Sequence, residues 1–287
     1  MAKDLEEQIE EIEKEIRETP YNKSTQHHIG RLKAKLSKLK DELERRGEGT
    51  AEGGGYAIKK EGDATVGLVG YPSVGKSTLL NTLTEAKSEV AEYDFTTLEV
   101  YPGIMKYNDA EIQILDLAGL VEGAASGKGR GKEVISVARE VDLIILMVDV
   151  FRNDINAMAN ELESMGIRLN KEPPEIVINK REKGGIEVSS TVELNNIEKE
   201  TVKQILREYS YINAVIVIRD DITPEELIDF LSGNRVYINA FSIINKIDLP
   251  HDGKKVEEKI DQWDPVFLSA KEGNGIQEVK KRMFKEL

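Results

Sequence analysis

Cysteine is missing from this 287-residue chain, which excludes disulfides, thiolate metal sites and thiol catalysis. Long apolar runs are missing as well: the most apolar stretch, residues 143–148, is far shorter than the ~20 residues of a membrane helix, and no N-terminal segment resembles a signal peptide. An excess of positive charge is missing too, because 53 Asp and Glu residues outnumber 40 Lys and Arg residues and the formal net charge is −13. We therefore expect a soluble, cytoplasmic protein without membrane contact, in which any nucleic-acid contact is a local basic patch.

One stretch has the pattern of a phosphate-binding loop. An apolar run at 66–69 leads into G-Y-P-S-V-G-K-S at 70–77 and then into an apolar helix start, which is the strand–loop–helix context that such a loop requires. Its glycines allow N–H groups to point at phosphates, its lysine reaches the β- and γ-phosphates, and its serine hydroxyl is a ligand for Mg²⁺. The flanking elements disfavour the alternative, a glycine turn before an ordinary helix. The expected nucleotide-binding residues here are Gly70, Pro72, Ser73, Val74, Gly75, Lys76, Ser77 and Thr78.

The first 50 residues predict a helical hairpin. Apolar residues recur at helical spacing in two stretches, which a break at 19–22 separates. The first stretch is acidic and the second basic, so some of these charges would pair the two helices. The alternative is that the basic face contacts a partner or RNA. The apolar seams are Leu5, Ile9, Ile12 and Ile16, then Ile29, Leu32, Leu36, Leu39 and Leu43, and the basic face is Arg31, Lys33, Lys35, Lys38 and Lys40.

Beyond a Gly-rich linker at 51–63, the chain predicts an α/β fold with a doubly wound, mostly parallel sheet. The near-continuous apolar run at 142–148 is typical of a central parallel strand that is buried on both faces. Other strands are expected at 66–69, 100–105, 112–115, 241–244 and 266–268, and helices at 155–165, at about 253–260 and after 275.

An insertion at 170–239 interrupts this sheet and predicts a small α/β module. Strands at 176–180 and 186–190 flank Lys183-Gly184-Gly185, which is a hairpin signal. A helix at 197–209, a strand at 214–218 and a helix capped by Thr223 complete it. The insertion contains no recognisable catalytic constellation, so packing or partner binding is its expected role.

Two short motifs follow strands of the main sheet, D-L-A-G at 116–119 and N-K-I-D at 245–248. Doubly wound folds bind ligands at the carboxyl ends of their strands, so these motifs and the phosphate loop together predict a P-loop GTPase. Asp116 would hold Mg²⁺ through water and the Gly119 N–H would sense the γ-phosphate. Thr97, or alternatively Thr96, would close over both as a switch. The catalytic candidates are Lys76, Thr97 and Gly119, and the metal ligands are Ser77, Thr97 and Asp116.

Guanine selectivity is expected from the second motif. The carboxylate of Asp248 can accept hydrogen bonds from guanine N1–H and the 2-amino group, which adenine cannot reproduce, so an ATPase is disfavoured. Asn245 would fix the loop and Lys246 would lie along the base. The loop of Ser269, Ala270 and Lys271 would complete the base site, with backbone N–H groups at guanine O6.

The full pattern closely resembles the Obg superfamily and, within it, the developmentally regulated GTP-binding proteins. The resemblance rests on G-Y-P-S-V-G-K-S-T-L-L-N, Y-D-F-T-T-L, D-L-A-G-L-V-E-G-A, N-K-I-D, S-A-K-E-G-N-G and the basic R-L-K-A-K-L-S-K-L. It implies a helix-turn-helix domain (1–50), a GTPase domain in two parts (64–169 and 240–287) and an inserted domain (170–239) like one of ribosomal proteins. It also implies work with ribosomes and a small stabilising partner protein. Family members usually end in a ubiquitin-like TGS domain, and this sequence stops at Leu287, so either this member lacks that domain or the sequence is a truncated form of a longer chain.

The expected activity is slow hydrolysis of GTP to GDP and phosphate by a nucleotide-dependent switch. Small GTPases of the Ras type carry a water-orienting Gln where this chain has Leu120, which cannot form a hydrogen bond through its side chain. Potassium activation stays open, because Ser73 stands where related potassium-activated GTPases carry Asn. The alternative function is a nucleotide-dependent protein- or RNA-binding module in which hydrolysis is incidental.

Overall fold

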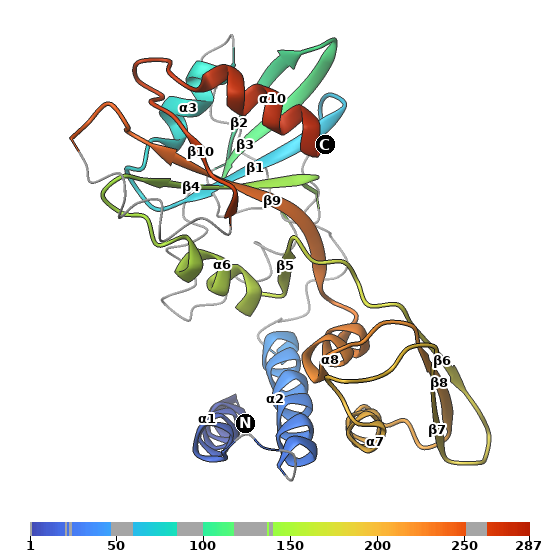
Figure 1. Cartoon of the computed structure of the whole chain (residues 1–287). Coiled ribbons are helices and arrows are strands. Elements are labelled where there is room, and N and C mark those ends of the chain that lie inside the picture. Colours follow the sequence, from blue (N-terminus) through green and yellow to red (C-terminus); the bar gives the residue numbers. More distant parts are fainter. Residues whose placement is uncertain are drawn as a thin grey trace. The chain divides into compact units, whose positions relative to one another are not determined.

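The computed structural model describes residues 2–20, 22, 25–46, 60–84, 100–117, 137, 140–250 and 263–287. The chain forms two compact units (Figure 1). The larger unit comprises residues 53–171 and 236–287, and the smaller unit comprises residues 1–52 and 172–235. None of the described helices combines the length and the apolar character needed to cross a membrane. Most of the predicted linker and the helix expected at 253–260 lie outside the described residues.

The larger unit is built on a seven-stranded sheet with the order β10-β9-β4-β1-β3-β2, in which β5 also pairs with β9. All pairs are parallel except that of β2 with β3. This is the predicted doubly wound, mostly parallel sheet, and β9 begins earlier than the expected residue 241. The strands are β1 (Ala64–Gly70), β2 (Val100–Tyr107), β3 (Ala110–Leu117), β4 (Leu143–Asp149), β5 (Ile167–Leu169), β9 (Val236–Asn245) and β10 (Val266–Phe267).

Helices cover both faces of this sheet. Alternate residues of β4 enter opposite cores: Ile144, Leu146 and Val148 pack in one apolar cluster, and Leu143, Ile145 and Met147 pack in the other. The first cluster includes residues of α6 (Ile155–Ser164), and the second includes residues of α3 (Lys76–Leu83) and α10 (Ile276–Glu286). Figure 1 shows α6 on one face of the sheet and α3 and α10 on the other. The apolar run therefore has the predicted central, doubly covered position.

The smaller unit combines the N-terminal helices with the insertion. Its helices are α1 (Ala2–Glu18), α2 (Gln26–Arg46), α7 (Lys199–Glu208) and α8 (Pro224–Ser232). Its three-stranded sheet consists of β6 (Ile176–Lys180), β7 (Ile186–Ser190) and β8 (Ala214–Ile218). Thr223 caps α8 as predicted: its hydroxyl accepts from the Glu226 N–H, while the Glu226 carboxylate accepts from the Thr223 N–H in return.

The predicted hairpin of β6 and β7 is wrong. The strand order is β6-β8-β7, with β8 antiparallel to β6 and parallel to β7. The turn signal itself is real, because Gly184 and Gly185 have φ values of +110° and +74°. The turn does not bring β6 and β7 together, because β8 lies between them. Ile216 and Ile218 of β8 are fully buried, which requires β8 to take the central position of the sheet.

The two N-terminal helices form the predicted hairpin, with Leu5, Ile9, Ile12, Ile29 and Leu32 buried along the facing seams. Charge also pairs them, because Lys40 Nζ lies 2.8 Å from Glu13 Oε1. The opposite side of α2 is not free, however.

This side of α2 packs on α7 and α8. Ala34 is fully buried in the core of the inserted module, and a Cβ on Gly30 would lie 2.8 Å from Thr201 Cγ2. Two lysines of the predicted basic face contact the module as well. Lys33 pairs with Glu225, and the Lys38 ammonium donates to the Glu208 carbonyl at 2.5 Å. The basic face is therefore divided: Arg31, Lys35, Lys38 and Lys40 are exposed, but of these Lys38 and Lys40 already have partners, and the side chains of Arg31 and Lys35 make no hydrogen bond or ion pair in the described chain.

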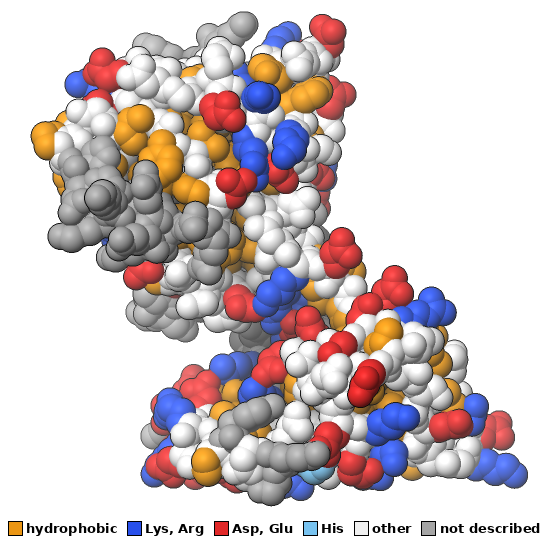
Figure 2. Space-filling model, in the orientation of Figure 1, with side chains coloured by type: hydrophobic (Ala, Val, Ile, Leu, Met, Phe, Trp, Pro, Cys, Tyr) orange, Lys and Arg blue, Asp and Glu red, His pale blue; other side chains and the backbone are white. Residues whose placement is uncertain are grey.

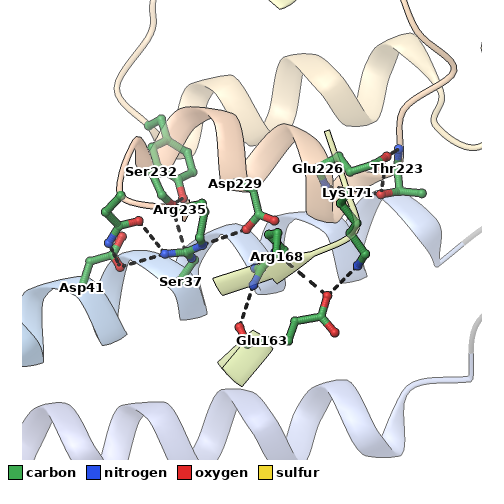
Figure 3. Close-up of polar contacts among 12 residues, drawn as sticks. Ser37, Asp41, Glu163, Arg168, Lys171, Thr223, Glu226, Asp229, Ser232 and Arg235 are labelled. Atoms are coloured by element: carbon green, nitrogen blue, oxygen red, sulfur yellow. Dashed lines mark hydrogen bonds and ion pairs between the residues drawn. The ribbon is translucent and has the colours of Figure 1, made fainter. Parts of the chain in front are cut away.

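A polar network joins α2 to the end of the inserted module (Figure 3). Arg235 lies at its centre, 2.8 Å from Asp229 through Nε and 3.3 Å from the Ser37 hydroxyl through a terminal nitrogen. The same guanidinium lies 3.9 Å from the Asp41 carboxylate. These contacts hold the last residue of the smaller unit, directly before β9 begins.

Candidate nucleotide-binding site

The loop between β1 and α3 requires both of its predicted glycines. A Cβ on Gly70 would lie 2.4 Å from the Met147 carbonyl oxygen, so the neighbouring strand leaves no space for a side chain. Gly75 has a φ of +103°, at the residue that precedes the first turn of α3. The loop thus folds tightly against the sheet and ends at a helix N-terminus, which is a geometry that binds anions.

Lys76 is the first residue of α3, and its side chain reaches back to this loop. Its ammonium donates to the carbonyl oxygens of Gly70 at 2.9 Å and Tyr71 at 3.2 Å, and the residue is 8% exposed. The positive charge is thus held over the loop that carries the N–H groups. This is the position from which a lysine can neutralise phosphate charge.

Asp116, near the end of β3, meets Ser77 in the first turn of α3. The Ser77 hydroxyl donates to Asp116 Oδ2 at 2.8 Å. The other oxygen, Oδ1, is buried and has no hydrogen-bond partner among the residues that the structure describes. Burial raises the pKa of Asp116, although the Ser77 hydroxyl and the Lys76 ammonium oppose this rise. A buried carboxylate with an unpartnered oxygen beside a hydroxyl fits Mg²⁺, which prefers oxygen ligands.

Asn245 connects the phosphate loop to the loop that follows β10. Its side-chain nitrogen donates to the Val74 carbonyl at 2.8 Å, and its side-chain oxygen accepts from the Ala270 N–H at 2.9 Å. The Ala270 carbonyl in turn accepts from the Thr82 hydroxyl of α3 at 3.1 Å. Because Asn245 is buried, these bonds are shielded from water and fix the two loops to each other.

Lys246 makes a second connection to the phosphate loop. Its ammonium lies 2.7 Å from the Ser73 carbonyl and 2.6 Å from Asp149 Oδ2. Asp149 is a residue that sequence reasoning missed. The available signal was its place at the carboxyl end of a buried parallel strand, where doubly wound folds bind ligands.

Asp248 is exposed and ionised. A hydrogen bond from the Ser269 hydroxyl is the largest influence on it and holds its pKa below the ordinary value. The Ser269 side chain is fully buried, so it fixes the direction in which the carboxylate points. An exposed, charged acceptor of this kind can receive two hydrogen bonds from a guanine edge.

The structure brings most of the predicted residues to one edge of the sheet. The register of the strands explains this, because Leu68 pairs with Asp116 and Asp149 pairs with Asn245. Thr97 and Gly119 lie outside the described residues, as does Leu120. The residues gathered at this edge are Gly70, Pro72, Ser73, Val74, Gly75, Lys76, Ser77, Thr78, Asp116, Asn245, Lys246, Asp248, Ser269, Ala270 and Lys271.

Comparison with known proteins agrees with this geometry. The family described as "50S ribosome-binding GTPase" matches residues 65–180, and the "C-terminal region of MMR_HSR1 domain" matches residues 183–287. A GTP-binding protein of Methanocaldococcus jannaschii is 50% identical over 99% of this chain and 73% of its own length. Developmentally-regulated G-protein 3 of Arabidopsis thaliana is 47% identical over 90% of this chain and 72% of its own. For human developmentally-regulated GTP-binding protein 2 the values are 48%, 84% and 67%.

Proposed function

Because this chain belongs to the family of developmentally regulated GTP-binding proteins and is therefore a P-loop GTP hydrolase, we propose that it works as a slow, nucleotide-dependent switch associated with ribosomes. One observation carries the nucleotide part of this proposal. The N-K-I-D loop donates two side-chain hydrogen bonds to carbonyls of the phosphate loop, from Asn245 to Val74 and from Lys246 to Ser73. A base-reading loop and a phosphate-reading loop thus form one continuous binding surface.

In this proposal each loop of the site has one task. The phosphate loop and Lys76 bind the phosphates, and Asp248 with the Ser269–Lys271 loop reads guanine. Ser77 and Asp116 would hold Mg²⁺, with Thr97 joining them in the GTP state. When bound, the metal would neutralise phosphate charge. The unpartnered Oδ1 of Asp116 supports this assignment, since a buried carboxylate oxygen needs a partner.

We expect slow turnover because the site can stabilise charge on the γ-phosphate but has no side chain at residue 120 that orients the attacking water. Lys76 and the Gly119 N–H can stabilise the charge that develops on the γ-phosphate, while Leu120 offers no side-chain hydrogen bond to the attacking water. The expected intrinsic rate is below about 10⁻² s⁻¹ at 25 °C, the range of GTPases without a supplied arginine finger. Hydrolysis would be accelerated by a partner, by potassium or by ordering of the Gly-rich segment at 123–131.

The ribosome or its RNA is the proposed partner, together with a small stabilising protein in the cytoplasm. The family description names a ribosome-binding GTPase. The described chain also offers an exposed basic pair, Arg31 and Lys35, one turn apart on α2. On the face that Figure 2 shows, acidic and basic side chains are interspersed over this unit, which favours a small local contact over a broad basic surface.

The test is multiple-turnover phosphate release from GTP, with and without ribosomes, in KCl and in NaCl. A switch should hydrolyse slowly alone and faster on ribosomes, and ribosome pelleting should retain it with a GTP analogue and release it with GDP. If ribosomes change neither rate nor retention, the ribosomal part of the proposal is wrong. If retention depends on the nucleotide but the rate does not, the protein is a binding module whose hydrolysis is incidental.

A further inference from the structure

Asp149 is a buried carboxylate at the end of β4, outside every motif that the sequence predicted for the site. It is 5% exposed. A buried carboxylate is costly unless each oxygen finds a partner, so its contacts indicate what it does. Its two oxygens have different partners.

The first oxygen, Oδ1, shapes the local turn. It accepts hydrogen bonds from the backbone N–H of Phe151 at 3.0 Å and of Arg152 at 2.8 Å. The turn places the Arg152 guanidinium over the ring of Tyr71, 3.6 Å from the ring centroid. Tyr71 belongs to the phosphate loop, so this turn packs against the rim of the site.

The second oxygen, Oδ2, has a different task. It lies 2.6 Å from the ammonium of Lys246, which also donates to the Ser73 carbonyl. Lys246 has a φ of +66°, a conformation that is uncommon for a residue with a side chain and that needs support from its surroundings. The ammonium is thus held at a fixed point between β4 and the phosphate loop.

The charge of Asp149 is stabilised where it stands. Burial alone would raise the pKa of its carboxyl group, but the Lys246 ammonium and the N–H groups of Arg152 and Phe151 outweigh burial and lower it. The carboxylate is therefore ionised at neutral pH, and its bond to Lys246 is charge-assisted.

We propose that Asp149 is a positioning residue for nucleotide binding, which acts by holding Lys246 between the phosphate loop and the guanine base. The inference rests on the proposed function, in which the stem of Lys246 lies along the base. Without the carboxylate, the Ser73 carbonyl is the one partner that the lysine ammonium keeps among the described residues, and its flexible stem regains rotamers that no longer cover the base. Nucleotide should then dissociate faster, whether it is GTP or GDP, while the choice of guanine remains with Asp248.

The test separates the two oxygens. Asp149→Asn retains an oxygen for the two N–H groups of the turn but removes the charge that faces Lys246. Stopped-flow release of a fluorescent GDP and of a fluorescent GTP analogue should become about tenfold faster for this variant, the effect of one charge-assisted hydrogen bond. The preference for GTP over XTP should not change. Asp154→Asn is the matched control, since Asp154 caps α6 five residues later, makes no hydrogen bond or ion pair with residues of the site in the described chain and should release nucleotide at the unmutated rate.

A double-mutant cycle shows whether Asp149 acts through Lys246. Lys246→Met should speed release by itself, and adding Asp149→Asn should give little further effect, because the shared contact is already lost. Effects that multiply would overturn the proposal, as would an Asp149→Asn variant that releases nucleotide like the Asp154→Asn control. If the unmutated protein has no preference for guanine nucleotides over ATP, the proposed function is wrong instead. Competition of GTP, XTP and ATP for the unmutated protein distinguishes this outcome.

Discussion

Gly75 and Asn245 lie so close together that a Cβ on Gly75 would be 2.3 Å from the side-chain nitrogen of Asn245. That nitrogen is bonded to the Val74 carbonyl, one residue before Gly75. The absence of a side chain at one position is therefore what allows the connection between the phosphate loop and the base loop. The packing of the two loops therefore depends on the space left by Gly75 as much as on the hydrogen bond from Asn245 to Val74.

Gly75→Ala should displace Asn245 and strain the backbone, because alanine is disfavoured at a φ of +103°. We expect at least about a hundredfold weaker GDP binding by fluorescence titration, and a loss of about 1–3 kcal/mol in stability. Gly184→Ala is the matched control: its φ is +110°, but no described atom lies within 4 Å of the added carbon. If both variants bind GDP equally well, the steric argument is wrong.

Asp248→Asn should weaken GTP binding and shift the preference towards xanthosine triphosphate. The carboxylate offers a charged acceptor to two guanine donors, and charge-assisted hydrogen bonds are stronger than neutral ones. Competition of GTP, XTP and ATP against a fluorescent nucleotide measures the shift. Equal binding of ATP and GTP by the unmutated protein would exclude the assignment of guanine reading to Asp248.

Asp116→Asn should separate stability from function. The pKa of Asp116 is higher in the folded state than in the unfolded state, so the charged carboxylate lowers the stability of the fold at every pH above the unfolded-state pKa. This loss of stability disappears as the pH falls below that pKa. The neutral amide removes the cost, so the Tm of the nucleotide-free protein at pH 7 should rise, by a few degrees for ~1 kcal/mol. Magnesium-dependent GTP affinity should fall. A lower Tm at pH 7 together with unchanged magnesium dependence would contradict both roles of the carboxylate.

Three substitutions rank the catalytic groups. In single-turnover hydrolysis, Lys76→Ala and Thr97→Ala should each lose about a hundredfold or more, since they remove charge stabilisation and the metal-linked switch residue. Leu120→Ala should lose less than about tenfold, because its side chain offers no hydrogen bond to the water. If Leu120→Ala lowered the hydrolysis rate as much as Lys76→Ala does, Leu120 would have a positioning role, which contradicts this prediction.

The exposed basic pair of α2 makes a prediction about salt. If Arg31 and Lys35 contact phosphates of ribosomal RNA, replacing both with Ala should reduce the slope of log affinity against log salt by about two at most. Lys281→Ala with Lys285→Ala removes the same charge from exposed positions on α10 and should leave the slope unchanged. Identical slopes for the two double variants would exclude a phosphate contact at α2.

The parts of the molecule that local patterns control could be predicted from the sequence. The buried strand at 143–148, the loop before Lys76 and the capped helix after Thr223 each depend on neighbouring residues, and the structure contains all three. The nucleotide site was accessible for a related reason, because its residues follow strands whose carboxyl ends share one edge.

The parts that depend on distant contacts could not be predicted in this way. The hairpin signal at Gly184 and Gly185 describes a turn, but strand neighbours are decided by which strand must be buried most completely. The clue was present in composition: β8 reads A-V-I-V-I, whereas β7 reads I-E-V-S-S. Similarly, no local feature of α2 indicates that its second face packs on α7. No local feature of β4 indicates that Asp149 pairs with Lys246, almost one hundred residues away.

The packing of α2 on α7 affects the order in which the chain can fold during its synthesis. About 150 residues separate the end of α2 from the start of α7. At about 5–20 residues per second, the growing chain carries α2 for roughly 8–30 s before α7 is made. Through that interval α1 can cover one seam of α2, while the face around Gly30 and Ala34 has no native partner. The smaller unit therefore completes its core late in synthesis, after the first strands of the GTPase sheet have been made.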